Sequence, residues 1–404
     1  MSSKKDLIEG ENIVALDIGT EKLKSLLFTV DDLGVKVKKV SRIEQQQHAM
    51  KSGIIKNLDT VLENCRLTIS ELNDKIPQDE YPQKVIMGIA GEYIQGVSIV
   101  VNYQREVNYE KEVTEKEERK ILVQIQNKIE ISGKEDLSQR IGLTNEDIEI
   151  LHITQTGLEI GGMPVDSLVG YKGRDVRLNF YASFAPKTYT EALKKVASEL
   201  KMQVLSIVSQ PFSVARAYSG STNRDFSAIF IDIGGGTTDL AIVEKGNVVE
   251  TKMFAFGGRT FTKEIAKILD LEYRFAEQRK IKYSKKELNK ELARDVQKIV
   301  YPVAKLWMKT LRSAFSYCDD ISSFPTQIYL CGGGALLPEI KEVMLEFPWK
   351  KFLPFPVVPK IEFFTPENLD NIKDNSGNLR YLFDVTPASL AKFVYDTKVK
   401  NSNG

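Results

Sequence analysis

The sequence predicts an α/β protein built from two similar lobes, and three glycine-bearing segments are the basis for this. Residues 13–28 (IVALDIGTEKLKSLLF) and 227–258 each contain an apolar run, the triplet Asp-Ile-Gly, a threonine and a second apolar run. A third glycine cluster lies within 328–340 (IYLCGGGALLPEI), again after an apolar run. Because β-rich and helical runs alternate between these segments, the pattern favours a duplicated α/β fold whose halves face each other.

The two Asp-Ile-Gly turns predict a site for the phosphate chain of a nucleotide. Glycines in a hairpin turn adopt dihedral angles that other residues avoid, and they let backbone N–H groups approach an anion closely. Aspartates at the same turns would repel phosphate unless a cation lay between them, so Asp17 and Asp232 predict Mg²⁺ held through water. One such turn is weak evidence, but two in matching positions make the phosphate site the stronger interpretation. The predicted phosphate-binding residues are Gly19, Thr20 and Lys22 on one side and Gly234, Gly235, Gly236, Thr237 and Thr238 on the other.

Together the three segments resemble the two phosphate motifs and the adenosine motif of the superfamily that contains actin, sugar kinases and heat-shock chaperones. QPFSVARAY (210–218) resembles the helix that connects the two halves. Residues 257–269 and 275–283 resemble the nucleotide-facing helices of the bacterial cell-division actin FtsA. Residues 149–211 resemble the end of the subdomain inserted in FtsA and its return to the core. The resemblance covers about residues 13–395, and the inserted subdomain narrows it to FtsA and its pilus-assembly relative PilM.

The resemblance implies ATP and Mg²⁺ as ligands, with Gln210, Asp17 and Asp232 as the catalytic set. Gln210 matches the superfamily position that orients the attacking water, and it implies slow hydrolysis because glutamine cannot act as a general base. A structural role for Gln210, capping or packing its helix, stays open. Glu277 and Lys280 are expected at the ribose and the base edge, or else as a salt-bridged exposed helix face. The other expected nucleotide-binding residues are Gly257, Gly258, Gly332, Gly333, Gly334 and Ala335.

The first half is predicted to open with a β-hairpin and then to alternate between strand and helix. The runs that flank the first turn are apolar and β-rich, and the helix that follows has apolar residues at helical spacing up to two prolines. The predicted elements are strands at 13–18, 23–30, 35–41 and 84–90 and a helix at 57–75.

An inserted subdomain is expected between the first lobe's opening strands and its return to the core. A charge run at 105–120 is interpreted as the solvated face of a helix. The elements expected in and after the insertion are a helix at 115–130, strands at 149–155, 157–160 and 174–184, and a return helix at 187–201.

The second half is predicted to repeat the hairpin at 227–254 and to continue with a largely helical, Lys- and Arg-rich region at 258–320. A Pro- and Phe-rich stretch at 347–359 is expected to be an irregular surface segment, and 386–396 to be the closing helix. The predicted segments are 1–84 (first lobe, N-terminal part), 85–185 (inserted subdomain), 186–211 (return to the first lobe), 212–257 (second-lobe core), 258–322 (helical nucleotide-facing subdomain), 323–385 (second-lobe core with the adenosine motif) and 386–404 (closing helix and short polar tail).

Composition and hydropathy argue against a strongly basic nucleic-acid-binding protein, a membrane-spanning protein and a secreted protein. With 404 residues, 42% of them hydrophobic, the chain can form two large cores, and a net charge of +1 gives no general attraction to nucleic acid or membrane. Its three cysteines are sparse and far apart, as expected in a reducing compartment. The N-terminal residues MSSKKDLIEG lack an apolar signal core and no apolar run reaches 18 residues, so a cytoplasmic location is expected.

The resemblance implies a filament-forming cell-division protein that associates with itself, with other divisome proteins and with a tubulin homologue like FtsZ, whose tail would meet the basic region 278–314. FtsA ends in an amphipathic membrane helix, whereas the end of this sequence, TKVKNSNG, is polar and short. Membrane contact is therefore expected only through a partner or a missing tail. Two alternatives stay open: a PilM-like adaptor of pilus assembly, and a small-molecule kinase of the same superfamily.

Overall fold

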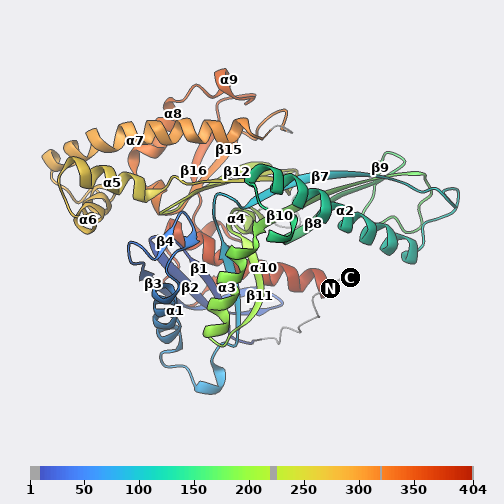
Figure 1. The fold of residues 1–404 in the computed structure, drawn as a ribbon, viewed down its shortest axis with the longest axis horizontal. Helices are drawn as coiled ribbons and strands as arrows, with labels where there is room; N and C mark the ends of the chain where they lie inside the picture. The colour runs from blue at the N-terminus through green and yellow to red at the C-terminus, as the bar shows by residue number, and fades with distance from the viewer. Residues whose placement is uncertain (1–9, 219–224, 319–320, 403–404) are drawn as a thin grey trace.

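Two β-sheets form the frame of the protein, one in each lobe (Figure 1). The computed structural model describes residues 10–218, 225–318 and 321–402. The first-lobe sheet has six strands, in the order β11 (Gln203–Ser209), β6 (Lys84–Ile89), β1 (Ile13–Ile18), β2 (Lys22–Asp31), β3 (Gly34–Glu44) and β17 (Ile372–Asp374). The second-lobe sheet has nine, in the order β16 (Lys360–Phe363), β15 (Gln327–Cys331), β12 (Ala228–Ile233), β13 (Thr238–Glu244), β14 (Asn247–Phe254), β7 (Gln95–Gln104), β10 (Asp175–Pro186), β8 (Ile148–Ile160) and β9 (Met163–Pro164).

The predicted duplication is visible in the strand pairing. In the first lobe β1 runs antiparallel to β2 and parallel to β6. In the second lobe β12 runs antiparallel to β13 and parallel to β15. The register pairs Asp17 with Lys24 in the first hairpin and Asp232 with Asp239 in the second. These four residues therefore occupy equivalent positions in the two lobes, which confirms the two-lobed α/β fold.

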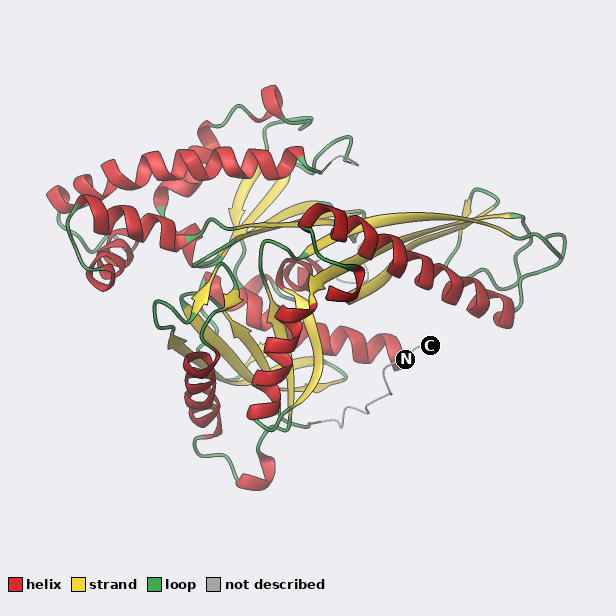
Figure 2. Ribbon diagram, in the orientation of Figure 1, coloured by secondary structure: helices red, strands yellow, loops and turns green. Residues whose placement is uncertain are grey.

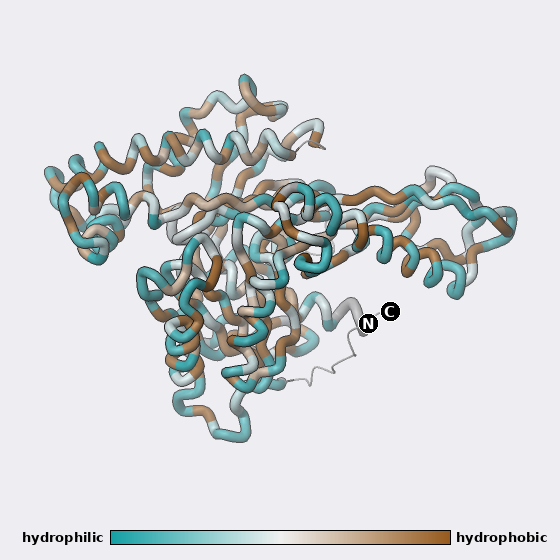
Figure 3. Tube along the Cα trace, in the orientation of Figure 1, coloured by the Kyte–Doolittle hydropathy of each residue, from teal (hydrophilic) through white to brown (hydrophobic). Residues whose placement is uncertain are grey.

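Helices lie between the two sheets and on their outer faces (Figure 2). The two connecting helices lie in the hydrophobic core between the sheets, because residues of both are buried there together with β1 and β12. The long second-lobe helix alternates between polar and apolar residues along its length (Figure 3) and buries one face. The connecting helices are α4 (Gln210–Tyr218) and α10 (Val385–Ser402); α1 (Leu58–Asn73) and α3 (Lys187–Glu199) cover the first lobe; α5 (Gly258–Ile268), α6 (Tyr273–Ser284), α7 (Lys290–Ser316), α8 (Pro338–Glu346) and α9 (Trp349–Phe352) belong to the second.

The insertion projects from the body of the molecule as an arm (Figure 1). Helix α2 (Glu115–Ile141) packs on one face of β7, β10 and β8. Although the arm is inserted in the first half of the sequence, its sheet continues that of the second lobe through pairing of β7 with β14. A short hairpin of β4 (Met50–Lys51) and β5 (Ile54–Ile55) stands apart from both sheets. The division of the chain into segments stays a prediction.

Three local predictions differ from the structure. Helix α2 extends to Ile141 instead of ending at residue 130, because it ends where Gly142 adopts a left-handed conformation (φ 70°). The two strands expected at 149–160 form the single strand β8, which has a bulge where its pairing with Asn179 and Phe180 shifts. The stretch 347–359 contributes buried Trp349 to the core, where its indole N–H donates to the Met344 carbonyl at 2.7 Å.

The junction between β7 and β14 depends on a glycine. A Cβ atom on Gly96 would lie 1.9 Å from the Tyr181 hydroxyl and 2.4 Å from Thr251 Oγ1. Neither neighbour has room to move, because Tyr181 and Thr251 are fully buried and their hydroxyls are joined at 2.9 Å. The arm can therefore join the second-lobe sheet only with glycine at this position.

We expect Gly96→Ala to lower the free energy of unfolding by about 1–3 kcal/mol, since a methyl group must be forced into a filled core. Val100→Thr is the matched control on the same strand: Val100 is 49% exposed, and the change should cost less than about 0.5 kcal/mol. Urea unfolding measures both. Equal stability of the two variants would contradict the tight junction.

Candidate functional site

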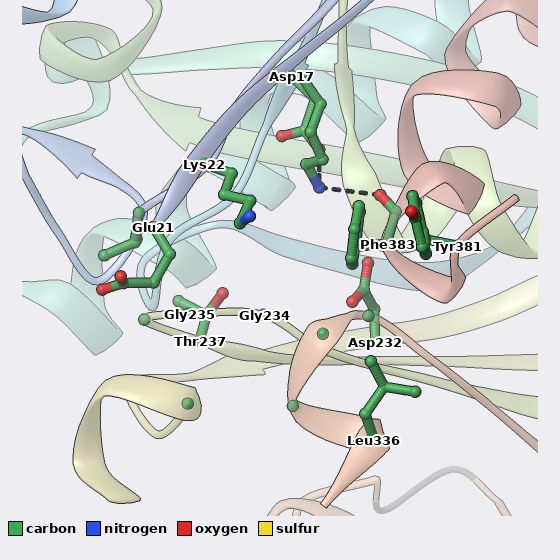
Figure 4. A pocket seen from close by; sticks show the side chains of 18 of the residues that line it. Asp17, Glu21, Lys22, Asp232, Gly234, Gly235, Thr237, Leu336, Tyr381 and Phe383 are labelled. Atoms are coloured by element: carbon green, nitrogen blue, oxygen red, sulfur yellow. Dashed lines mark hydrogen bonds and ion pairs between the residues drawn. The ribbon is translucent and has the colours of Figure 1, made fainter. Parts of the chain in front are cut away.

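The glycine-bearing turns of the two lobes meet at one cavity of about 450 Å³ (Figure 4). A cavity of this size is typical of sites for small ligands and cofactors. Of the nineteen residues predicted from the sequence, sixteen line it: Asp17, Gly19, Thr20, Lys22, Gln210, Asp232, Gly234, Gly235, Gly236, Thr237, Gly258, Glu277, Lys280, Gly332, Gly333 and Gly334.

The two phosphate turns touch each other at one end of this cavity. A Cβ atom on Gly236 would lie 2.5 Å from Thr20 Oγ1, so the backbone of the second turn lies directly against the side chain of the first. The Thr20 hydroxyl also accepts a hydrogen bond from the Gly53 N–H at 3.1 Å. One anion of the length of a triphosphate can therefore contact both turns at once.

A buried lysine lies among the carboxylates at the floor of the cavity. The Lys24 Nζ atom is 2.5 Å from Asp17 Oδ2 and donates to the Phe383 carbonyl at 3.1 Å. The other Asp17 oxygen accepts from the Gln210 amide at 2.8 Å, and Asp232 Oδ2 accepts from the Thr386 hydroxyl at 2.7 Å. Burial lowers the pKa of Lys24, but the charges of Asp17 and Asp232 outweigh it and hold this pKa above its ordinary value. Lys24 therefore stays charged at neutral pH.

Asp239 adds a third carboxylate to the floor. It is 3% exposed and lines the cavity opposite Asp232 in the hairpin register. Within the described part of the chain, its Oδ1 atom has no hydrogen-bond partner. Burial, and then the charge of Asp232, raise the pKa of Asp239 well above its ordinary value, which a hydrogen bond from Thr237 offsets only in part. Burial also raises the pKa of Asp232, which the charge of Lys24 offsets only in part. A cation bound at this floor would stabilise the charged forms of these buried carboxyl groups.

The donors at the floor suit a hydrated cation better than one bound directly by the protein. Among residues 10–218, 225–318 and 321–402, no group of three or more His, Cys, Asp or Glu side chains is arranged to hold a metal ion. Mg²⁺ keeps several of its waters and is commonly bound by one or two carboxylates together with phosphate oxygens. Asp17 and Asp232, with the unpartnered oxygen of Asp239, fit that mode of binding.

The predicted ribose and base residues are already engaged with the protein. Lys280 of α6 is 8% exposed, and its ammonium donates to the Gly258 carbonyl at 3.0 Å, to Thr262 at 2.8 Å and to Glu277 at 2.7 Å. Glu277 also accepts from the Thr262 hydroxyl. The salt bridge of the alternative interpretation is present, but the pair is not on an exposed helix face, because the side chains of Lys280 and Glu277 are only 10% and 21% exposed. The two side chains join α5 to α6 along one wall of the cavity.

Three predicted site residues lie outside the cavity lining. Thr238 faces the core, where its hydroxyl donates to the Phe256 carbonyl at 2.6 Å and accepts from the Trp307 indole at 2.9 Å. A strand side chain at the position after Thr237 must point to the opposite face of the hairpin, so the two adjacent threonines cannot both face the cavity. Ala335 is also buried, and Gly257 adopts extended backbone as the N-cap of α5.

Sequence reasoning missed several residues that line the cavity. Lys24 and Asp239 could have been found from the alternation of side chains along the strand that follows each turn. The segment that includes Tyr381 and Phe383 carries no motif, and it reaches the cavity through tertiary packing. Arg42 anchors this segment, because it makes a paired hydrogen bond to the buried carboxylate of Asp384 at 2.7 Å through both Nε and Nη2.

Sequence comparisons link the chain to FtsA. The family model described as "Cell division protein FtsA" matches residues 229–369. FtsA of Enterococcus hirae is 24% identical over 392 residues, which cover 84% of this chain and 87% of that protein. FtsA of Pseudomonas aeruginosa is 23% identical over 279 residues, which cover 68% of this chain and 61% of that protein. FtsA of Neisseria meningitidis is also matched over 61% of its length, so the matches span about three fifths of these two relatives.

Structure comparisons agree on the fold. A PilM structure from the PilM–PilN type IV pilus biogenesis complex has a TM-score of 0.67 at 13% identity, covering 95% of this chain and 98% of the PilM chain. The ethanolamine utilization protein EutJ from Carboxydothermus hydrogenoformans has a TM-score of 0.51 at 15% identity, covering 96% and 92%. In the part of the chain that the structure describes, no helix has the length and apolar character needed to cross a membrane. The predicted resemblance is confirmed: the chain is similar to FtsA in sequence and shares the actin-like fold of PilM.

Proposed function

We propose that this chain binds ATP with Mg²⁺ in the interlobe cavity and forms actin-like filaments as an FtsA-like cell-division protein. The observation that carries the proposal is the meeting of two matched Asp-Ile-Gly hairpins over a buried acidic floor. Sixteen of the predicted site residues share this one cavity. The sequence relatives reported above are cell-division proteins and support the division role.

In this proposal the glycine backbones and the hydroxyls of Thr20 and Thr237 hold the phosphates. Lys22, whose side chain is 37% exposed at the cavity edge, supplies positive charge. Mg²⁺ would neutralise charge on the phosphate oxygens, with Asp17 and Asp232 ordering its waters. Asp239 contributes the unpartnered oxygen described above.

Gln210 is proposed to position the water that attacks the terminal phosphate. Gln210 is the first residue of α4, and its amide N–H donates to Asp17, at the end of β1, at 2.8 Å. A glutamine can orient water by hydrogen bonding, but it cannot take its proton near neutral pH. Hydrolysis should therefore be slow, and the main role structural.

We propose that the filament forms by self-association, that the arm contributes to the contacts between subunits, and that the basic region 278–314 receives the tail of an FtsZ-like tubulin homologue. The protein would act on the cytoplasmic side of the membrane and reach it through a partner or a tail. The second candidate is a PilM-like adaptor of pilus assembly, which shares the fold but is less favoured because the sequence relatives are FtsA proteins.

Sedimentation with and without nucleotide separates these two functions. At micromolar protein, Mg²⁺–ATP should move most of the chain into the pellet, and electron micrographs of the pellet should show filaments. ATP binding without any pelleting would contradict the filament and favour the adaptor. Absence of ATP binding by calorimetry would contradict both.

Asp239→Asn should make the ligand-free protein more stable, by on the order of 1 kcal/mol, because it removes a carboxyl group whose charged form is disfavoured by burial. The same change should weaken Mg²⁺–ATP binding about tenfold or more, since the floor attracts the cation less strongly. Thermal unfolding with and without Mg²⁺–ATP measures both effects. Asp370→Asn, at an exposed position, is the matched control. A variant with normal ATP affinity would refute the role of the acidic floor.

Gln210→Ala should lower the rate of ATP hydrolysis by about tenfold or more while the dissociation constant for ATP stays within about threefold. Single-turnover hydrolysis and equilibrium titration separate the two quantities. Ser213→Ala is the control, because the Ser213 hydroxyl donates to the Gln210 carbonyl at 2.9 Å and does not line the cavity, so its loss should leave hydrolysis unchanged. Equal losses in binding and hydrolysis for Gln210→Ala would make this residue structural.

A further inference from the structure

Arg259, near the start of α5, holds both phosphate turns at once. Its backbone N–H donates to the Gly235 carbonyl of the second turn at 2.8 Å. Its side chain crosses to the first lobe, where Nη2 donates to the Thr20 carbonyl at 2.7 Å and Nε donates to the Glu21 carboxylate. One residue of the second lobe therefore spans the contact between the two turns.

The same guanidinium also fixes the loop that follows β3. Its Nη1 atom donates to the Gln47 carbonyl at 3.0 Å and to the Met50 carbonyl at 2.8 Å. The Arg259 side chain is 13% exposed and that of Glu21 is 22% exposed, so water competes only weakly for these bonds. A planar fork of donors suits this set of carbonyl and carboxylate oxygens, and the ammonium of lysine does not.

Glu21 receives a second donor from the second lobe. The Tyr273 hydroxyl of α6 donates to its carboxylate at 2.9 Å. Burial, and then the charge of Glu21, raise the pKa of Tyr273, so the phenol stays protonated and keeps donating. Without Arg259, the negative charge of Glu21 would lie uncompensated in the turn between Thr20 and Lys22, beside the proposed phosphates.

We propose that Arg259, Glu21 and Tyr273 form an interlobe latch that holds the two phosphate turns together and sets how long a nucleoside triphosphate stays bound. The inference rests on the proposed nucleotide function. A triphosphate clamped between the turns can leave only when they separate, and separation breaks every side-chain bond of Arg259 to the first lobe. The latch is a positioning device, and its main effect is on the rate of nucleotide release.

Release of a fluorescent ATP analogue, chased with excess ATP in a stopped-flow instrument, tests the latch. Arg259→Ala should speed release by at least about tenfold, because it leaves the largely shielded carboxylate of Glu21 without its cation. Glu21→Ala and the double variant should release the analogue at similar rates, between those of wild type and Arg259→Ala. Both variants lack the latch, but neither leaves the Glu21 carboxylate without its cation. Arg259→Lys should lie between wild type and Arg259→Ala. Lys263→Ala removes an exposed charge from the same helix and should match wild type.

Hydrogen exchange of residues 45–51 without nucleotide gives a readout that does not depend on the proposed function. Loss of the bonds to Gln47 and Met50 should speed exchange there by about tenfold in folded Arg259→Ala, and not in Lys263→Ala. Faster release with faster exchange supports the latch. Release within twofold of wild type, or unchanged exchange, overturns it. If the wild-type chain binds no nucleotide, the proposed function fails and the exchange result alone decides the latch.

Discussion

The buried ammonium of Lys24 determines how the two lobes meet. It lies 2.5 Å from Asp17 of its own hairpin, and its charge partly offsets the burial that raises the pKa of Asp232. Charges buried this deeply are tolerated only when they are paired, because each loses its hydration. The carbonyl of Phe383 and the hydroxyl of Thr386 complete the arrangement from the start of α10. Residues of both lobes and of the closing helix therefore take part in one buried polar network.

The fold and the core of the site could be predicted because their signals are local. An Asp-Ile-Gly turn after an apolar strand can be recognised from a short stretch of sequence, and two such turns indicate a duplication. The same local pattern predicted Thr238 as a site residue. In the structure, alternation along the strand places its side chain in the core instead. Residues that depend on distant partners could not be found in this way. Arg42 and Asp384 are 342 residues apart, and the sequence around each residue contains no motif that predicts their pairing.

The position of the arm is the largest feature that the sequence could not predict. Its strand β7 pairs with β14 at only two described positions, Val97 with Glu250 and Gly96 with Thr251. Pairing at a sheet edge depends on tertiary context, and neither strand specifies its partner. The arm also rests on the connecting helices, where Tyr181 stacks on Phe212 with ring centres 4.8 Å apart. A change in the angle between the lobes must therefore carry the arm with the second lobe or break this junction.

The central claim is that one triphosphate contacts both hairpins at the same time. The most direct measurement is a crystal structure with a non-hydrolysable ATP analogue and Mg²⁺. The account predicts phosphate oxygens within hydrogen-bonding distance of backbone N–H groups at 19–22 and at 234–237, with the metal ion and its waters beside Asp17 and Asp232. Phosphates bound to only one turn, or an analogue bound outside the interlobe cavity at saturating concentration, would contradict it.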